Sequence, residues 1–410
     1  MYKCRACETD INKSFLSLGN SPVSNANIKK EDLNKMESYY PLELYVCPEC
    51  MLVQIDEFET VKNIFSSDYA YFSSYSKSWL KHCEDYTEMM INRFGYNKDS
   101  YVMEIASNDG YLLQYFVEHN IPILGIEPTS NTAEAARKKG IPTDITFFNE
   151  DYAKKVKNTG RLPDLIIGNN VLAHNPNLID FVKGLKIALS NGGVITMEFP
   201  HLLKLIEHNE FDTIYHEHFS YFSLYSVNKL FSRYGLEIFD VEELTTHGGS
   251  LRIYAKHKED NSKLVKCNVI SLLNKEKLFG LYDLDFYNNF DNKVKSIKRN
   301  ILQFLIQTKN EGKKIVGYGA PAKGNTLLNY CGIRTDFIDY TVDLSPYKQG
   351  KYLPGTHIPI YSPDKIKDDK PDYIIILPWN IKDEIIKQLE YTKEWNCKLI
   401  TLIPEVEIHT

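Results

Sequence analysis

The sequence contains no apolar run long enough to cross a bilayer and no excess of positive charge. Its longest apolar stretches, such as "YIIILPW", fall far short of the roughly 20 residues that a membrane-spanning helix needs. The net charge of the 410 residues is −6, whereas proteins that bind nucleic acid non-specifically are usually basic. The first residues, "MYKCRACETD", lack the apolar segment of a secretory signal. We therefore expect a cytoplasmic monomer that binds neither nucleic acid nor membrane.

The chain also lacks internal repeats and low-complexity tracts, so its length predicts two or three globular domains. We expect a cysteine-containing domain in residues 1–70, an open α/β sheet in residues 71–262 and a second α/β domain in residues 311–410. Residues 263–310 are expected to join them as a helical linker. Within it, apolar residues keep helical spacing from about residue 280 to residue 310, which predicts one long amphipathic helix through Phe286, Phe290, Val294, Ile297, Ile301 and Phe304.

Cysteine is sparse, and half of the eight cysteines stand in two Cys-x-x-Cys pairs, "CRAC" and "CPEC". Two residues between thiolates let one tight turn present both sulfur atoms to one ion, and two such turns complete a tetrahedral site. The pattern predicts a structural zinc ion with no open position for catalysis, held by Cys4, Cys7, Cys47 and Cys50. Disulfides are not expected in a reducing compartment, so the single cysteines are predicted to be small buried side chains: Cys83, Cys267, Cys331 and Cys397.

Glycine is scarce in the first turn of the α/β region, "SYVMEIASNDGYLL", which reads as a buried strand, a polar turn and the start of a helix. Glu127 ends the next strand, about one β-α-β unit after Glu104, where an acid accepts ribose hydroxyls. Because only Gly110 is a glycine, the turn suits S-adenosylmethionine better than the diphosphate of NAD, although a turn without any cofactor also fits the pattern. The predicted cofactor residues are Ala106, Ser107, Asn108, Gly110, Tyr111, Leu112, Glu127 and Pro128.

Further strands extend the same sheet. "PDLIIGNNVLAHNPN" predicts a strand that ends in Asn169 and Asn170, which we add to the cofactor site, and "GGVITMEFPH" predicts the next strand. "LEIFDVEEL" and "GSLRIYAKH" read as a hairpin that closes the sheet. The order is that of an S-adenosylmethionine-dependent methyltransferase, so the predicted fold class is α/β with a Rossmann-like methyltransferase domain.

Five motifs in this order resemble the deoxysugar C-methyltransferases, which methylate C3 of nucleotide-linked 4-keto sugars. They are the cysteine pairs, "EIASNDGYLL", "YHEHFSYFS", "HGGSLR" and "GYGAPAKGNTLLNY", and the resemblance covers essentially the whole chain. It implies a zinc-binding N-terminal domain, a methyltransferase domain and a C-terminal Rossmann-like domain that helps to hold the nucleotide sugar. It also implies S-adenosylmethionine as cofactor and a nucleotide sugar as substrate.

The reaction of that family defines what the active site needs. Loss of the proton next to a ketone gives an enolate, so the site needs a base at that carbon, a donor at the carbonyl oxygen and a methyl sulfonium in line. The resemblance places Tyr71 beside the cofactor and makes His218 the general base. It assigns these residues to the active site: Tyr69, His174, Tyr215, Glu217 and His218.

Plainer interpretations stand beside these assignments, because the chain has 28 tyrosines and 11 histidines and most of them must be structural. Tyr71 or Tyr75 is an alternative to Tyr69, His174 is placed where it can cap a helix, and His216 is interpreted as a packing residue. Two histidines and a carboxylate also suggest a metal site, but their spacing is not that of the helical His-Glu-x-x-His motif.

The segment "IYHEHFSYFS" carries a structural requirement. In a regular strand, alternate side chains face opposite ways, so Tyr215 and His218 would point apart. Both residues line one pocket only if the chain turns between them. We therefore expect a bend or loop there, at the mouth of the cofactor cleft.

Two glycine-containing motifs complete the predicted site. In "HGGSLR", backbone approaches a ligand closely and Arg252 meets a phosphate, unless the motif is a plain hairpin turn. "KKIVGYGAPAKGNTLL" is a strand, a glycine-rich turn and a helix start, which alone suggests NAD or a vestigial site without ligand. The resemblance implies contact with the diphosphate or nucleoside of the sugar nucleotide. The predicted substrate residues are His247, Gly248, Gly249, Ser250, Arg252, Gly319, Ala320, Lys323, Asn325 and Asp343.

Two other functions remain compatible with the sequence. One is a methyltransferase of the same architecture that acts on an oxygen atom of a nucleotide sugar. The other is an inactive zinc-ribbon interaction protein. Binding of S-adenosylmethionine separates the second of these from both enzymes.

Overall fold

The computed structural model of the protein describes residues 2–58, 60 and 72–409. Its largest sheet has seven strands in the described residues, in the order β12-β13-β10-β9-β6-β7-β8. The last five are parallel to one another, and the hairpin β12–β13 packs antiparallel beside β10. The bounds are β6 Val102–Ile105, β7 Ile123–Ile126, β8 Thr143–Asp144, β9 Leu165–Asn169, β10 Val194–Pro200, β12 Leu236–Leu244 and β13 Ser250–His257.

Helices cover both faces of this sheet, which explains why β6 and β9 are buried along their whole length. One face packs against α2 to α4 and the other against α5, α6 and α8. The predicted order of strands and the closing hairpin are confirmed. The bounds are α2 Lys77–Phe94, α3 Leu113–Glu118, α4 Ser130–Lys138, α5 Glu150–Asn158, α6 Leu178–Ala188, α7 Leu202–Glu207, α8 Leu224–Arg233 and α9 Cys267–Phe279.

The N-terminal region forms an antiparallel sheet that takes one strand from far along the chain. Its order is β11-β5-β4-β3, and β11 lies directly after the "YHEH" segment. A short ribbon of β1 and β2 carries the first cysteine pair. The bounds are β1 Tyr2–Lys3, β2 Asp10–Ile11, β3 Ser14–Ser21, β4 Tyr40–Val46, β5 Val53–Gln54 and β11 Ser220–Tyr221. A strand from the second predicted domain therefore completes the sheet of the first.

The C-terminal region is a second, smaller α/β layer of strands and short helices. Its sheet runs β16-β15-β14-β17-β18-β19, with only β19 antiparallel to its neighbour. The strands are β14 Ile315–Tyr318, β15 Thr341–Val342, β16 Ile360–Tyr361, β17 Tyr373–Ile376, β18 Lys398–Thr401 and β19 Glu407–His409. The helices are α12 Ala322–Cys331, α13 Lys365–Asp369 and α14 Lys382–Gln388.

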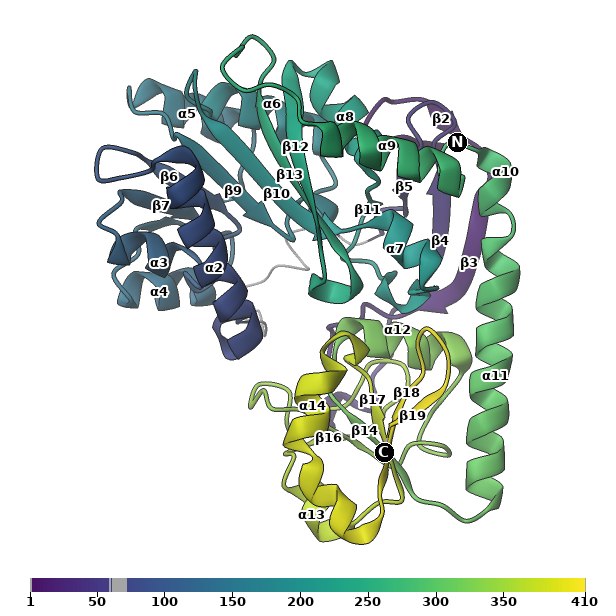
Figure 1. Cartoon of the computed structure of the whole chain (residues 1–410). Helices are drawn as coiled ribbons and strands as arrows, with labels where there is room; N and C mark the ends of the chain where they lie inside the picture. The colour runs from purple at the N-terminus through teal and green to yellow at the C-terminus, as the bar shows by residue number, and fades with distance from the viewer. Residues whose placement is uncertain (1, 59, 61–71, 410) are drawn as a thin grey trace.

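The second part of the linker, from about residue 280 to residue 310, forms two helices instead of the single long helix that its periodicity predicts. Helix α10 spans Leu284–Tyr287 and α11 spans Phe290–Asn310. The break falls at Asn288 and Asn289, a residue type that favours helix ends over helix interiors. Figure 1 shows α11 running along one side of the molecule from the N-terminal sheet to the C-terminal region.

Short 3₁₀ segments connect many of these elements. They are η1 Lys30–Asp32, η2 Ser73–Tyr75, η3 Leu172–His174, η4 Phe211–Thr213, η5 Thr246–Gly248, η6 Trp379–Ile381 and η7 Glu390–Trp395. Segments η3 to η6 lie near the carboxyl edge of the large sheet or face it from the C-terminal region.

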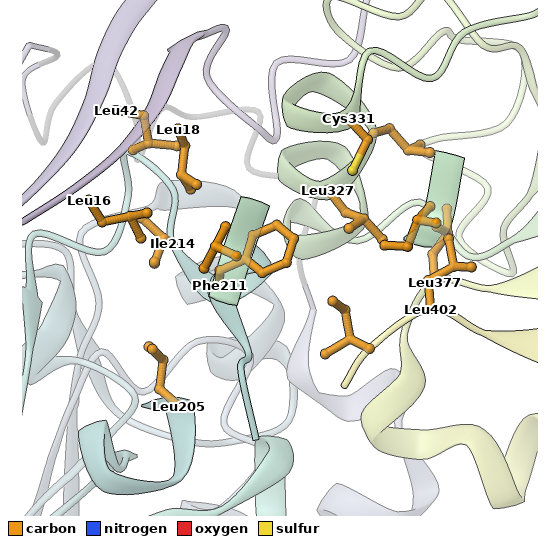
Figure 2. Close-up of a cluster of buried hydrophobic side chains, with 14 of the residues drawn as sticks. Leu16, Leu18, Leu42, Leu205, Phe211, Ile214, Leu327, Cys331, Leu377 and Leu402 are labelled. Atoms are coloured by element: carbon orange, nitrogen blue, oxygen red, sulfur yellow. The ribbon is translucent and has the colours of Figure 1, made fainter. Parts of the chain in front are cut away.

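One hydrophobic cluster connects all three regions. Figure 2 shows Leu16, Leu18 and Leu42 of the N-terminal sheet beside Phe211 and Ile214, with Leu327 and Leu377 of the C-terminal region completing the cluster. Burying a side chain of this size stabilises by about 1.5–3 kcal/mol. Ile214 is fully buried and directly precedes Tyr215, so the segment that carries the candidate base is anchored in this core.

The loop between β3 and β4 reaches the C-terminal region. Ile28 and Tyr352 exchange two backbone hydrogen bonds of 2.9 Å, and the backbone nitrogen of Gly355 donates to Oε2 of Glu37 at 2.8 Å. This loop therefore joins the N-terminal sheet to the C-terminal region.

Two further expectations concern membranes and single cysteines. In the described ranges, no helix has the length and apolar character that crossing a membrane requires. Cys83 and Cys331 are buried as predicted, but Cys267 is exposed and Cys397 is half-buried. Cys267 is the first residue of α9 and is exposed there, so its expected burial is wrong.

Candidate active site

A cavity of about 810 Å³ lies at the carboxyl edge of the parallel strands. The segments that follow five of these strands line it with Ala106, Glu127, Thr146, Asn170 and Pro200. The N-terminal region adds Asn25 to Asn27, and the C-terminal region adds Lys323, Lys348 and Lys351. Ligands of open α/β sheets bind at this edge. The cavity is therefore the candidate active site, and all three regions build it.

The turn after β6 has a left-handed backbone at three positions, of which one is glycine. The angle φ is +56° at Ala106, +48° at Asn108 and +76° at Gly110. Such conformations cost non-glycine residues about 1–3 kcal/mol each and cluster at functional sites. Of the predicted cofactor residues in this turn, Ala106, Asn108 and Tyr111 line the cavity, whereas Ser107, Gly110 and Leu112 are buried beneath it.

Glu127 supports the same turn from the end of β7. Its Oε2 accepts a hydrogen bond from the backbone nitrogen of Asn108 at 2.9 Å, and its Oε1 accepts one from the backbone nitrogen of Thr129 at 2.8 Å. Burial raises the pKa of this carboxyl group, while the hydrogen bonds oppose that rise. The Thr129 hydroxyl also donates to Oε1. A carboxylate has about four acceptor positions, so capacity remains on Oε2 for a ribose hydroxyl. Glu127 and Pro128 both line the cavity.

Asn169 and Asn170 end β9 and line the cavity beside the turn. Asn170 has a left-handed backbone with φ of +55°, and its backbone nitrogen donates to the carbonyl oxygen of Glu198 at 2.7 Å. The Oδ1 atoms of both asparagines are buried and accept no hydrogen bond from the residues that the structure describes. Buried acceptors without partners facing a cavity fit a ligand with N–H or O–H groups.

Tyr215 to His218 form a tight turn, which the resemblance requires. The backbone nitrogen of His218 donates to the carbonyl oxygen of Tyr215 at 2.9 Å, and β11 begins only at Ser220. The turn places the hydroxyl of Tyr215 2.8 Å from Nε2 of His218. Both side chains line the cavity.

The contacts of His218 fix its tautomer. Its Nδ1 lies 3.1 Å from the carbonyl oxygen of Thr213, which only accepts, so Nδ1 carries the hydrogen. Nε2 therefore has the lone pair, and the Tyr215 hydroxyl donates to it. Burial lowers the pKa of His218 well below its usual range, and the neighbouring His174 lowers it further. The imidazole is neutral at physiological pH.

His174 stands against His218, with ring centroids 4.6 Å apart. Its Nδ1 donates to the carbonyl oxygen of Glu217 at 2.6 Å, and burial lowers the pKa of His174 to about 4. Segment η3, which ends in His174, thus fixes the backbone of the Tyr215–His218 turn. His174 lines the cavity as well.

Glu217 directs a carboxyl group at the cavity from the middle of the turn. Its Oε1 accepts hydrogen bonds from the backbone nitrogen of Asn25 at 3.3 Å and from Nδ2 of Asn25 at 3.1 Å. Its Oε2 is buried without a partner in the described residues, and burial raises the pKa to about 7. His216, by contrast, donates to the carbonyl oxygen of Pro41 at 3.2 Å and does not line the cavity, as expected of a packing residue.

Most of the "HGGSLR" segment packs against other parts of the protein and does not line the cavity. His247 lines the cavity, but a Cβ on Gly248 would lie 2.6 Å from the ring of Trp379, so the close approach here is between η5 and the C-terminal region. Gly249 and Ser250 do not line the cavity.

Arg252 is also placed away from the cavity, inside the sheet. Its Nη2 lies 2.8 Å from Oε2 of Glu198 and its Nη1 lies 3.0 Å from Oε2 of Glu242. The guanidinium group compensates the buried carboxylate of Glu198 on β10 and pairs with the half-buried Glu242 on β12, so we correct its expected phosphate contact to a structural one.

The second glycine turn is closed by its own acid. Asp343 accepts a hydrogen bond from the backbone nitrogen of Ala320 at 2.8 Å, and Lys348 lies 3.3 Å from the same oxygen. Of the five residues predicted here, Lys323 lines the cavity and the other four do not: Gly319, Ala320, Asn325 and Asp343.

Several cavity residues escaped the sequence interpretation. Thr146 to Asn149 follow β8, a strand of two residues without an apolar run. The signal that could have found them is their position, because ligands bind at the carboxyl ends of parallel strands. Asn25, Asn27, Lys348, Lys351 and Asn380 come from loops of the other two regions, and no local pattern indicates them. Tyr69 and Tyr71 lie outside the described residues.

The four paired cysteines converge as predicted. Their sulfur atoms all lie within 4.8 Å of one another, and the Cys4–Cys50 and Cys7–Cys47 pairs are 3.5 and 3.4 Å apart. Four thiolates in this arrangement fit a tetrahedral zinc ion and leave no position for substrate. The group fixes the ribbon of β1 and β2 to the turn before β5.

The sheet order, the polar turn and the acid at the end of β7 define an S-adenosylmethionine-dependent methyltransferase with a structural zinc site. Family models match three consecutive parts of the chain: "Putative zinc binding domain" over residues 4–65, "Methyltransferase domain" over residues 81–241 and "C-methyltransferase C-terminal domain" over residues 245–404. C-methyltransferase NovU of Streptomyces niveus is 31% identical over 411 residues, which cover 99% of this chain and 96% of that protein. The chain belongs to this family of C-methyltransferases.

Solved structures align with less than half of the chain. An S-adenosylmethionine-dependent methyltransferase of Anabaena variabilis is 14% identical over 42% of this chain and 83% of its own, with a TM-score of 0.35. Magnesium protoporphyrin IX methyltransferase of Synechocystis, with bound S-adenosylmethionine, is 11% identical over 43% of this chain and 78% of its own, with a TM-score of 0.33.

Proposed function

We propose that the protein methylates C3 of a nucleotide-linked 4-keto deoxysugar through an enolate, with His218 as the general base. One observation carries this proposal. A neutral imidazole with its lone pair on Nε2 lies in a cavity, next to a tyrosine hydroxyl, at the carboxyl edge of a methyltransferase sheet. A carbon next to a ketone is the type of carbon that such a base deprotonates.

The proposed sequence of steps uses the groups already described. Nε2 of His218 removes the proton from C3, and the electron pair moves into a C3–C4 double bond while the carbonyl oxygen gains negative charge. His174 keeps the turn in place through the carbonyl of Glu217, and the Tyr215 hydroxyl turns from His218 to a donor position toward substrate. S-adenosylmethionine, when bound, supplies an electrophilic methyl group.

The low pKa of His218 suits this role because the base must be neutral before it acts. At pH 7, Nε2 carries no proton that would have to leave before the base acts. The imidazolium forms together with the enolate, and the two opposite charges stabilise each other in a cavity of low dielectric constant. A positioned base of this kind contributes about 10²–10⁴-fold to the rate.

The test is an assay of the purified protein with methyl-labelled S-adenosylmethionine and a panel of nucleotide-linked 4-keto sugars deuterated at C3. We expect one or more members to gain a methyl group on C3, located by fragmentation in mass spectrometry, with loss of the deuterium. A methyl group on oxygen with the deuterium retained would establish the O-methyltransferase alternative. Failure to bind S-adenosylmethionine in calorimetry would support the inactive interaction protein.

A further inference from the structure

Lys323 is a half-buried lysine at the wall of the cavity. It lies in the first turn of α12, and Pro321, Ala322 and Lys323 all line the cavity. Its Nζ donates to Oδ1 of Asn380 at 2.9 Å and lies 4.3 Å from the ring centroid of Trp379. Removing water from an ammonium group costs free energy. A lysine that is largely shielded from water and has few direct partners is therefore a candidate for a functional position.

Two buried carboxyl groups, those of Asp212 and Glu210, act electrostatically on this lysine. Asp212 of η4 accepts a hydrogen bond from Nε1 of Trp379 at 2.7 Å, and Glu210 precedes η4 with its Oε1 buried. Burial lowers the pKa of Lys323, and the charges of Asp212 and Glu210 oppose that change. Neither carboxyl group lines the cavity, so they favour the charged form of Lys323 without occupying the space for a ligand.

The charge of Lys323 reaches the candidate base. Together with burial, it lowers the pKa of both His218 and His247, two histidines that line the same cavity. One turn further along α12, Thr326 Oγ1 donates to the carbonyl oxygen of Ile214 at 3.0 Å, so the helix that carries Lys323 packs against the residue before Tyr215. Lys348 and Lys351 also line the cavity, from the loop after β15, and neither is described in contact with Asp212 or Glu210.

We propose that Lys323 is a catalytic residue whose ammonium group donates to the carbonyl oxygen at C4 and stabilises its negative charge in the enolate. This role depends on the function proposed above. As His218 takes the C3 proton, the carbonyl π pair moves to that oxygen, and Lys323 holds it by a charge-assisted hydrogen bond. The pair then returns, the carbonyl re-forms and C3 bonds the methyl group as the methyl–sulfur bond breaks, which leaves neutral S-adenosylhomocysteine. The C3 proton stays on His218, and Lys323 gains and loses no proton overall.

The acids near Lys323 argue against the expected contact with the diphosphate. Burial raises the pKa of Glu210 to about 8, so Asp212 is the acid that carries charge at pH 7. A diphosphate keeps its full negative charge before and after reaction, and the nearby Asp212 carboxylate would repel it throughout. A ketone oxygen is neutral in the substrate and becomes negative only in the transition state. A cation placed there binds the transition state more tightly than the substrate, which is the condition for catalysis.

The experiment separates these roles by measuring enolate formation without methyl transfer. With S-adenosylhomocysteine in place of the cofactor, the wild-type protein should exchange the C3 hydrogen of its keto-sugar substrate for deuterium in D2O. Lys323→Gln should slow this exchange about 100-fold or more, the typical effect of removing one donor to an oxyanion. The Kd of the matching nucleoside diphosphate, measured by calorimetry, should stay within about threefold of wild type.

Three variants make the result decisive. Lys323→Arg keeps the positive charge and should retain more exchange than Lys323→Gln. Lys348→Gln should weaken nucleoside diphosphate binding more than Lys323→Gln does. Lys298→Gln is the matched control, because Lys298 also lies over an aromatic ring, that of Tyr330 at 4.5 Å, but outside the cavity. Its exchange rate should equal that of wild type.

Two outcomes would overturn the role of Lys323. One is a Lys323→Gln protein with normal exchange and weakened diphosphate binding, which would restore the diphosphate contact. The other is a folded Lys323→Gln protein, judged by its thermal unfolding, with both properties unchanged. If the wild-type protein neither exchanges nor methylates any keto sugar, the proposed function itself fails, and the role of Lys323 fails with it.

Discussion

The turn after β6 and the turn after β14 share one construction. In each, an acid at the end of the next parallel strand accepts a hydrogen bond from the turn: Glu127 from Asn108 at 2.9 Å, and Asp343 from Ala320 at 2.8 Å. They differ in what lies above them. Glu127 lines the cavity, whereas Asp343 does not, and Pro378 lies close over Gly319 of the second turn. The shared pattern therefore predicts how each turn folds, and the surrounding regions decide which turn meets a ligand.

Removing the acid of the first turn should have the largest effect on ligand binding. Glu127→Ala removes acceptors for ribose hydroxyls and the support of Asn108, and hydrogen bonds to charged groups contribute about 1.5–3 kcal/mol each. We expect the Kd of S-adenosylmethionine, measured by calorimetry, to rise by about 30-fold or more. Asp343→Ala should leave that Kd within about twofold. An equal rise in this Kd for Glu127→Ala and Asp343→Ala would contradict the difference between the two turns.

Removing the acid of the second turn should reduce stability instead. Asp343→Ala leaves the backbone nitrogen of Ala320 and the ammonium group of Lys348 without this partner. We expect the free energy of unfolding in urea to fall by about 1–3 kcal/mol. A variant that unfolds like wild type would show that Asp343 is free for a ligand, as the sequence predicts.

A third acid, Glu217, should make the free energy of unfolding depend on pH. Burial raises its pKa from 4.5 to about 7, so the folded protein binds this proton more tightly than the unfolded chain does. The stability that it contributes is present below pH 4.5 and is lost as pH rises through 7. Glu217→Gln should therefore raise the free energy of unfolding by about 1–3 kcal/mol at pH 8 and change it little at pH 4. A gain confined to pH 4 would contradict this environment.

Exchanging the turn residues themselves should give the smallest effect. Ala106 holds φ of +56°, so Ala106→Gly should raise the free energy of unfolding by about 1 kcal/mol, with S-adenosylmethionine binding unchanged. The reverse change in the second turn, Gly319→Ala, would place a Cβ 2.6 Å from Pro378 and should destabilise. Thermal unfolding and calorimetry measure both. Weakened cofactor binding in Ala106→Gly would mean that the strained backbone itself positions the ligand.

The sequence predicted features that depend on local pattern. The cysteine pairs, the parallel strands, Glu127 and the bend before His218 all follow from spacing or from motifs. The misses depend on contacts between distant segments. Arg252 pairs with acids on neighbouring strands that no motif indicates, and Asn25 reaches Glu217 only because the loop after β3 crosses to it. The break between α10 and α11 was missed because two asparagines interrupt an apolar pattern that itself continues.

His218 offers the most direct test of the account. The substitution His218→Asn should abolish deuterium exchange at C3 and methyl transfer, while the Kd of S-adenosylmethionine stays at the wild-type value. The matched variant is His216→Asn, two residues away and outside the cavity, which should retain both activities. Exchange that persists in His218→Asn, in a protein that still binds S-adenosylmethionine, would contradict the assignment of His218 as the base.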